Sequence, residues 1–268
     1  LGSAGDRFGS AIREQVMLSQ DAEHALRDHA QQVLVARPGQ AGLLARMAAV
    51  LRGLDALPYL RERVLGLHWS ADRAIEAYVR VVGELLCVVH EAADQVDDPD
   101  LARLLEATYQ LMLGKEFAGQ ERAIGAAMYA SGCSSADQQA RLRQLIDAQG
   151  RCLSAFTASA PAALRGQWHR LQQAQDSTEL QHMRRALREA GLGDIDTALC
   201  DDWFCCCSRR INGLKAMEEA LVLQLLDACR QRLAGLQTEW QVLQQLCERT
   251  PMAPLSHGAM LAAGLVGP

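Results

Sequence analysis

The stretch GKEFAGQERAIGAAMYASG at residues 114–132 places Arg122 on a helix face whose neighbours are almost all small. Gly119 and Gly125 have no side chain, so another backbone or a small ligand can approach this face closely. The other small residues are Ala118, Ala123, Ala126, Ala127 and Ala130. A buried guanidinium with so few partners requires an anion. The stretch therefore predicts a helix with a slot beside Arg122.

The composition favours an all-helical protein. Hydrophobic residues make up 49% of the 268 residues, enough for a substantial core, but aromatic residues are only 4%. Leu, Ala, Gln, Glu and Arg form helices well, and the β-branched and aromatic residues that strands prefer are scarce. We expect two antiparallel four-helix bundles that share long helices. One helical domain would occupy residues 1–249, and residues 250–268 would form a disordered tail.

Capping residues and prolines predict where most helices begin. Ser70 and Asp98 are N-cap residues, and Ser135 forms a capping box with Gln138. Pro58 kinks or splits the helix that contains it. The expected helices span residues 7–35, 40–67, 71–95, 99–130, 135–156, 161–173, 176–190 and 194–249.

Charge and cysteine content exclude several classes of function. The net charge is −5, so the chain as a whole repels nucleic acid and acidic membranes, and an anion site needs locally placed arginines. The nine cysteines lack the spacing of a disulfide framework or a metal site, so we expect a reducing cytoplasm and no cofactor or metal. No apolar run is long enough to span a membrane. A chain that begins with Leu1 rather than Met is expected to be a fragment or a processed product.

Two groups of cations are candidates for binding an anion. Lys115 and Arg122 share a helix face with Gly119, and Gln120 lies one position further round, where its amide can donate. Arg184 belongs to a run of arginines near the end of its helix. Both groups have an ordinary alternative, because such residues also form surface ion pairs and solvated helix faces.

An enzyme is the least favoured interpretation. Glu179 with His182, and Asp21 with His24, imitate the carboxylate–histidine pairs of di-iron helix bundles. The imitation is incomplete, because such sites also need carboxylates from two further helices. The chain has no nucleophile elbow, phosphate loop or dinucleotide fingerprint. We therefore expect a protein without catalytic activity.

Over about residues 1–233 the chain resembles the nitrate- and nitrite-sensing (NIT) domain family. The most specific element is KEFAGQERAIGAAMYASG, which is similar to the family's KE-x-AGQERA-x-GA run. LPYLRERV and WFCCCSRRINGLKAMEEAL are similar to further family stretches in the same order. The resemblance implies an all-helical domain that binds nitrate or nitrite with arginines between helices and passes the signal to an attached output module.

The resemblance also assigns site residues. The arginine of GQER falls on Arg122, and the family's arginine in the penultimate helix falls on Arg184. Lys115 and Gln120 are weaker candidates from their helix positions alone. A third family arginine belongs to an ERG-x-S motif that would precede the LGS sequence at residues 1–3.

The output of such a domain is the least determined feature of the sequence. An RNA-binding antiterminator (ANTAR) module often follows the domain in this family, and no such module is visible after Leu246. We expect signalling to transcription antitermination, or another regulatory output, through an attached RNA-binding module or a partner protein. The segment itself is not expected to bind nucleic acid, and a homodimer stays open. The alternative is a helical interaction or scaffold module in which the arginines form ion pairs.

Overall fold

The computed structural model describes residues 9–36, 41–173, 175–190 and 194–249, and these contain helices but no strand. The all-helical fold predicted from the sequence is confirmed. The chain divides into two compact units, residues 1–223 and 224–268. The single domain over residues 1–249 and its arrangement as two four-helix bundles stay predictions. The expected tail at 250–268 lies outside the described residues.

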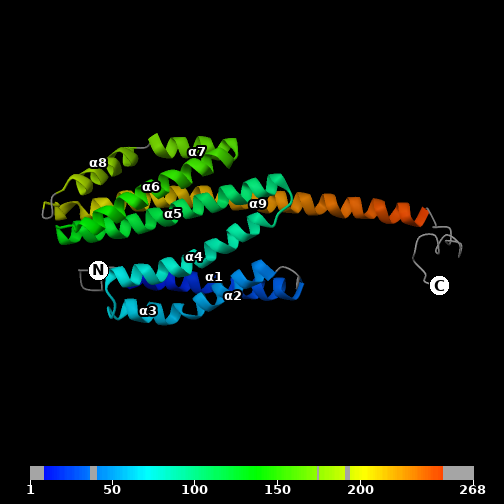
Figure 1. The fold of residues 1–268 in the computed structure, drawn as a ribbon, viewed down its shortest axis with the longest axis horizontal. Coiled ribbons are helices and arrows are strands. Elements are labelled where there is room, and N and C mark those ends of the chain that lie inside the picture. The colour runs from blue at the N-terminus through cyan, green and yellow to red at the C-terminus, as the bar shows by residue number, and fades with distance from the viewer. Residues whose placement is uncertain (1–8, 37–40, 174, 191–193, 250–268) are drawn as a thin grey trace, which may run out of the picture. The chain divides into compact units, whose positions relative to one another are not determined.

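Long helices dominate the described residues (Figure 1). The elements in chain order are α1 Gly9–Ala36, α2 Ala41–Asp55, α3 Leu57–Leu65, α4 Ala71–Asp94, α5 Pro99–Ser131, α6 Ala136–Ser159, α7 Ala162–Gln173, α8 Gln175–Glu189, the 3₁₀ turn η1 Thr197–Leu199 and α9 Cys200–Arg249.

Most of the predicted helix boundaries are confirmed. Ser70 and Asp98 accept hydrogen bonds from backbone N–H groups in the first turns of α4 and α5. Ser135 and Gln138 form both bonds of the predicted capping box. Gly132 ends α5 with a φ of 68°, the left-handed conformation that glycine adopts without a steric penalty. Local side-chain chemistry therefore determines these boundaries.

Two helix boundaries needed more than the sequence pattern. Pro58 splits the second expected helix, because α2 ends at Asp55 and α3 begins with the proline in its first turn. The last helix was predicted to begin at Asp194, which is wrong: α9 begins at Cys200. Asp196 accepts a hydrogen bond from the N–H of Ala198 and caps a separate 3₁₀ turn, which delays the helix.

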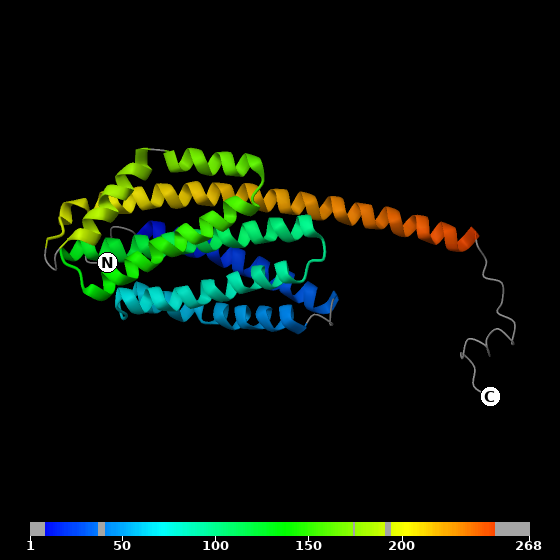
Figure 2. The same cartoon turned by 45° about the horizontal axis from the view of Figure 1, so that its top comes forward.

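Within residues 1–223, apolar side chains form separate cores. One core lies among α2, α3 and α4 and includes Val50, Leu60 and Ala77. The others lie among α5, α6, α7, α8 and the first part of α9. Figures 1 and 2 show α5, α6 and this part of α9 side by side. Because these long helices pack side by side, side chains from distant parts of the sequence meet between them.

The slot predicted at the glycines of α5 is partly filled. A Cβ atom added at Gly125 would lie 2.2 Å from the Trp203 ring, so this glycine makes room for an indole rather than a ligand. Gly114 packs against Leu153 in a similar way. By contrast, nothing lies within 4 Å of a Cβ added at Gly119. The small residues of α5 therefore serve mainly to let α6 and α9 approach closely.

Candidate functional site

Four helices each contribute one polar side chain to the interior at the same place. These residues are Glu121 of α5, Gln149 of α6, Arg184 of α8 and Arg210 of α9, and we call them the polar layer. Glu121, Gln149 and Arg184 are 1%, 1% and 4% exposed, and Arg210 is partly buried. Charged groups this far from water need partners, so the contacts of the layer show which of its charges are compensated.

The helix registers explain why these polar residues face inward. On α5, Glu121 continues a buried row at alternating spacings of four and three residues, formed by Ala107, Leu111, Gly114, Ala118, Gly125 and Met128. On α9, Arg210 continues a similar row formed by Trp203, Cys207, Leu214, Met217 and Leu221. The apolar residues on either side bury each helix face. Glu121 and Arg210 are consequently carried into the interior with them.

Glu121 and Arg184 form a bidentate ion pair. Nε and Nη2 of Arg184 each donate to a Glu121 carboxylate oxygen at 2.6 Å. Gln149 donates to Glu121 at 2.6 Å and accepts from Arg184 Nη2 at 3.2 Å. Paired carboxylate and guanidinium groups of this geometry form strong hydrogen bonds. The remaining nitrogen of Arg184, Nη1, makes no hydrogen bond with the described residues.

Arg210 is the cation of the layer that forms no ion pair with the described residues. Its Nε is shielded from solvent and has no hydrogen-bond partner among the described residues. Its guanidinium carbon lies 5.4 Å from the centre of the Trp168 ring, a cation–π contact. Burial, and then the neighbouring charge of Arg184, lower the pKa of Arg210 to about 10. The fold therefore holds this charge in an unfavourable environment.

Arg122 lies beside the layer on α5. Its Nη1 donates to the Ser208 hydroxyl at 2.9 Å, and its guanidinium carbon lies 4.8 Å from the centre of the Phe204 ring. Trp203 Nε1 donates to the Arg122 carbonyl oxygen at 3.0 Å. Burial lowers the pKa of Arg122, and no carboxylate contributes to the shift. Arg122 is thus a second cation that lacks an acidic partner in the described chain.

Cys207 links Arg122 to the polar layer. The thiol is 2% exposed, and the positive charges of Arg184 and Arg122 act to lower its pKa. The same thiol acts to raise the pKa of Arg210. Burial, and then the negative charge of Glu121, raise the pKa of Cys207, so the thiol stays neutral at physiological pH. The charges of three guanidinium groups and of the Glu121 carboxylate are therefore felt at or near this neutral thiol.

Two of the four residues predicted from the sequence lie at or beside the polar layer, and two do not. Arg184 belongs to the polar layer, and Arg122 lies beside it and donates to Ser208. Lys115 instead forms an ion pair with Glu218 of α9. Gln120 donates to Glu116 at 3.0 Å and accepts from Arg141 at 3.0 Å. Lys115 and Gln120 thus have partners outside the polar layer.

Three members of the polar layer were missed by the sequence reasoning. Glu121 and Arg210 were recognisable from spacing, because each interrupts an otherwise apolar row on its helix. The small residues of this stretch pointed to Arg122 and not to the adjacent Glu121. Gln149 gave the same signal, because it interrupts the row formed by Leu142, Leu145, Cys152 and Phe156 on α6.

Other sites are poorly supported in the described residues. No group of three or more His, Cys, Asp or Glu side chains there is arranged to hold a metal ion. None of the helices of this part of the chain is both long and apolar enough to cross a bilayer. A surface hollow between α1 and α3 includes Arg61, which donates to Ser19 at 2.7 Å. The polar layer is therefore the strongest candidate.

Comparison with known proteins agrees with this fold. The profile of the family described as nitrate and nitrite sensing (NIT) matches residues 1–226. The chain belongs to this family of sensory domains.

Its relatives are regulatory proteins by name. The chain is 35% identical over 199 residues to the nitrate regulatory protein of Klebsiella oxytoca. This match covers 74% of the chain and 49% of the relative, so the chain spans about half the length of that protein. The solved structure of the NasR transcription antiterminator is similar, with a TM-score of 0.78 and 29% identity. The similarity covers 91% of this chain and 66% of the NasR chain.

Proposed function

We propose that the chain is a sensory domain that binds nitrate or nitrite at the polar layer and at Arg122. The observation that carries the proposal is the local charge. Arg184 is paired with Glu121, whereas neither the buried Nε of Arg210 nor the guanidinium of Arg122 has a carboxylate partner among the described residues. The desolvated cations are stabilised when a monovalent anion joins them. Membership of the nitrate and nitrite sensing family supports this choice of anion.

The chemistry of the anion fits these donors. Nitrate is planar and has three acceptor oxygens, which match the planar fork of N–H donors on a guanidinium group. Arg210 offers its unpaired Nε, and Arg184 offers Nη1 while its other nitrogens hold Glu121. The Arg210 guanidinium lies over the Trp168 ring, and its Nε is shielded from solvent. Of the other two candidates, Lys115 and Gln120, neither is needed for these contacts.

Binding would change the packing of α9. Arg210 belongs to α9, whereas Arg184 belongs to α8 and Arg122 to α5, so one anion holds three helices together. A ligand shifts a conformational equilibrium by as much as it prefers one packing over the other. Since α9 extends in sequence to Arg249, a change at Arg210 has a continuous helix along which to act. The regulatory output, including transcription antitermination, would receive the signal through α9.

Thermal unfolding with added anions tests this function. Nitrate and nitrite are expected to raise the melting temperature of the chain, because a ligand that binds only the folded state stabilises it. Chloride at the same ionic strength is expected to have a smaller effect. Arg122→Met should lose most of the nitrate effect, whereas Arg143→Met, which removes an exposed arginine of α6, should retain it.

A scaffold module without a ligand predicts a different result. In that case the melting temperature would not distinguish nitrate from chloride in any of these proteins. Equal responses of Arg122→Met and Arg143→Met would also show that the anion binds elsewhere.

A further inference from the structure

A short segment of α9 holds both the side chain and the backbone of Arg122. Nη1 of Arg122 donates to the Ser208 hydroxyl at 2.9 Å, and the guanidinium carbon lies over the Phe204 ring at 4.8 Å. Phe204 and Ser208 are four positions apart, so they lie on the same face of α9. Trp203 Nε1 donates to the Arg122 carbonyl oxygen at 3.0 Å. These contacts from one helix determine where the guanidinium group of Arg122 lies.

The contacts of Arg122 leave one edge of its guanidinium group unused. Nε and Nη2 form no hydrogen bond with the described residues. In Arg184 the same two nitrogens hold the Glu121 carboxylate, each at 2.6 Å. Two N–H groups side by side on one edge match two oxygens of a planar anion. Arg122 thus offers the pair of donors that Arg184 uses for a carboxylate.

We propose that Ser208 is a positioning residue, which orients the Arg122 guanidinium group so that its Nε and Nη2 face a bound oxyanion. The role of Ser208 rests on the proposed anion-binding function. Ser208 acts through Arg122 and needs no contact of its own with the anion. Because its hydroxyl accepts from Nη1, it restrains the guanidinium group and leaves the other two nitrogens to the anion.

A hydroxyl group suits this role better than a carboxylate. An arginine side chain has many rotamers, and ordering it when an anion binds has an entropic cost. Ser208 and Phe204 hold Arg122 before the anion arrives, so less of this cost falls on binding. A carboxylate at the position of Ser208 would also neutralise the guanidinium charge, as Glu121 does for Arg184. The neutral hydroxyl leaves this charge available to the anion.

The orientation of Arg122 also favours oxyanions over chloride. Two oxygens of nitrate or nitrite meet both N–H groups only when they lie in the plane of the guanidinium group. Chloride is spherical, so it bonds to a guanidinium group equally well in any rotation. Loss of the Ser208 hydroxyl should therefore weaken the binding of nitrate more than the binding of chloride.

Calorimetric titration of the full chain with nitrate, and separately with chloride, tests the role of Ser208. Ser208→Ala should weaken nitrate binding about three- to tenfold, the range that one hydrogen bond contributes. Its chloride affinity should stay close to that of the parent. Ser208→Thr keeps the hydroxyl and should bind nitrate as the parent does. The melting temperature of both variants without anion should stay close to that of the parent, because Ser208 is only half-buried.

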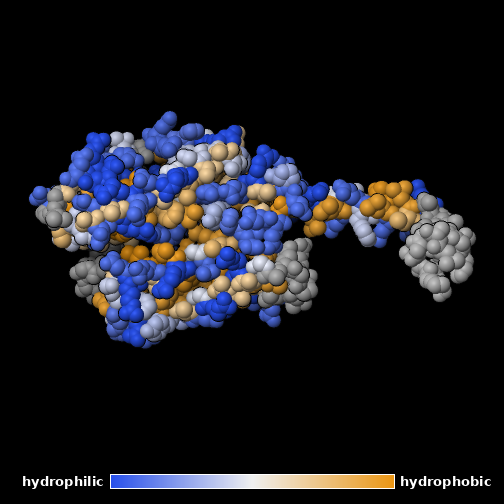
Figure 3. Space-filling model, viewed as in Figure 1, coloured by the Kyte–Doolittle hydropathy of each residue, from blue (hydrophilic) through white to orange (hydrophobic). Residues whose placement is uncertain are grey.

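Thr238→Val is the matched control, because it removes a hydroxyl group from the same helix. The Thr238 hydroxyl donates to the Ala234 carbonyl oxygen at 3.0 Å. From Cys229 to Arg249 every residue of α9 is exposed, and Figure 3 shows the side chains of this segment on the surface. The control should therefore bind nitrate with the affinity of the parent.

A parent chain that binds no nitrate contradicts the proposed function and the role of Ser208 together. If the parent binds nitrate and Ser208→Ala binds it equally well, the anion site stands and the role of Ser208 is wrong. If Ser208→Thr loses as much affinity as Ser208→Ala, the hydroxyl does not orient Arg122, and the proposal is overturned. A loss of nitrate and chloride affinity by the same factor overturns it as well.

Discussion

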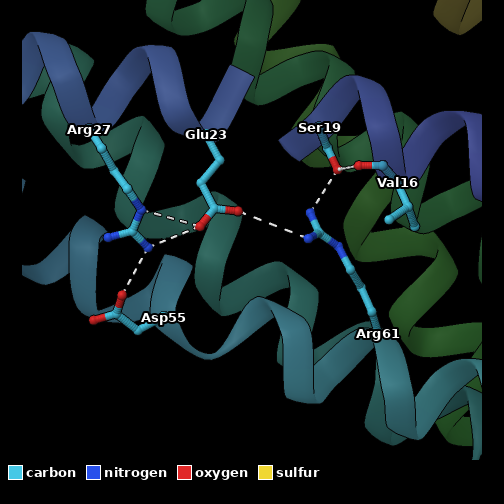
Figure 4. A network of polar contacts seen from close by, with 6 residues as sticks. All are labelled: Val16, Ser19, Glu23, Arg27, Asp55 and Arg61. Atoms are coloured by element: carbon cyan, nitrogen blue, oxygen red, sulfur yellow. Dashed lines mark hydrogen bonds and ion pairs between the residues drawn. The ribbon is translucent and has the colours of Figure 1, made fainter. Parts of the chain in front are cut away.

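The chain contains two clusters of arginines that differ in their charge balance. The first, which we call the α1–α3 network, joins Arg27 and Arg61 to Glu23 and Asp55 (Figure 4). Arg27 Nη2 lies 2.9 Å from Glu23 and 2.8 Å from Asp55, and Arg61 Nη1 lies 3.9 Å from Glu23. Each cation here has an acidic partner. The network therefore needs no further ion.

The polar layer and Arg122 have the opposite property. Glu121 is fully engaged by Arg184 and Gln149, and Arg210 has no comparable partner among the described residues. Arg61 and Arg184 are both buried, so burial alone does not distinguish the clusters. The balance between cations and carboxylates distinguishes the two clusters. The proposed anion site therefore rests on the missing counter-charge in the polar layer and not on the clustering of arginines as such.

The largest effect on stability is expected from Glu121→Gln. This change leaves the buried Arg184 without its carboxylate, and breaking a buried ion pair costs about 3–5 kcal/mol. Because nitrate can supply the missing negative charge, nitrate should stabilise this variant more than it stabilises the parent. Urea unfolding with and without nitrate measures both effects.

Glu116→Gln is the matched control, since Glu116 is on the same helix but accepts from Gln120, outside the polar layer. It should change the free energy of unfolding and the nitrate response much less. The comparison would fail if both variants responded to nitrate equally.

A smaller effect of opposite sign is expected from Arg210→Met. Below pH 10 Arg210 is charged in both the folded and the unfolded chain, so the folded state carries the full cost of burying the charge. Replacing a buried charge with an apolar side chain should raise the free energy of unfolding at pH 7 by about 1–2 kcal/mol. The same change should abolish stabilisation by nitrate.

The pH dependence supplies the control for Arg210. As the pH rises through about 10, folded Arg210 loses its proton before the unfolded side chain does, so the stability advantage of the variant should shrink. Urea unfolding at pH 7, 10 and 11 follows this trend. A variant that is less stable than the parent at pH 7 would show that Arg210 is a structural cation.

The smallest effect is expected in the α1–α3 network. Asp55→Asn removes one partner of Arg27, but the Asp55 side chain is 67% exposed. Exposed ion pairs contribute about 0.2–1 kcal/mol, so the free energy of unfolding should fall by no more than this. The nitrate response should equal that of the parent in calorimetry. A weakened response would place the anion in the wrong cluster.

The fold was largely predictable because helix boundaries depend on local chemistry. Ser70, Asp98 and the pair Ser135–Gln138 form caps with residues a few positions away, so the sequence contains the whole interaction. The start of α9 was mispredicted because Asp196 caps a 3₁₀ turn instead of the long helix. Choosing between two caps of similar strength requires the packing around them.

The candidate site was less predictable because its charge balance depends on contacts between helices. Family resemblance pointed to Arg122 and Arg184, but the pairing of Arg184 with Glu121 spans 63 residues of sequence. The unpaired state of Arg210 is a property of several helices together. Sequence spacing can place such a residue on an inward face, but it cannot show which partners it meets there.

Nuclear magnetic resonance of the arginine Nε–H groups tests the central claim most directly. The resonances are assigned with single arginine-to-methionine variants, and nitrate is then titrated against chloride at constant ionic strength. The account predicts that the Nε–H resonances of Arg122, Arg184 and Arg210 shift together and saturate with one affinity, while those of Arg27 and Arg61 stay unchanged. Nitrate-dependent shifts at Arg27 or Arg61, or none at Arg210, would contradict it.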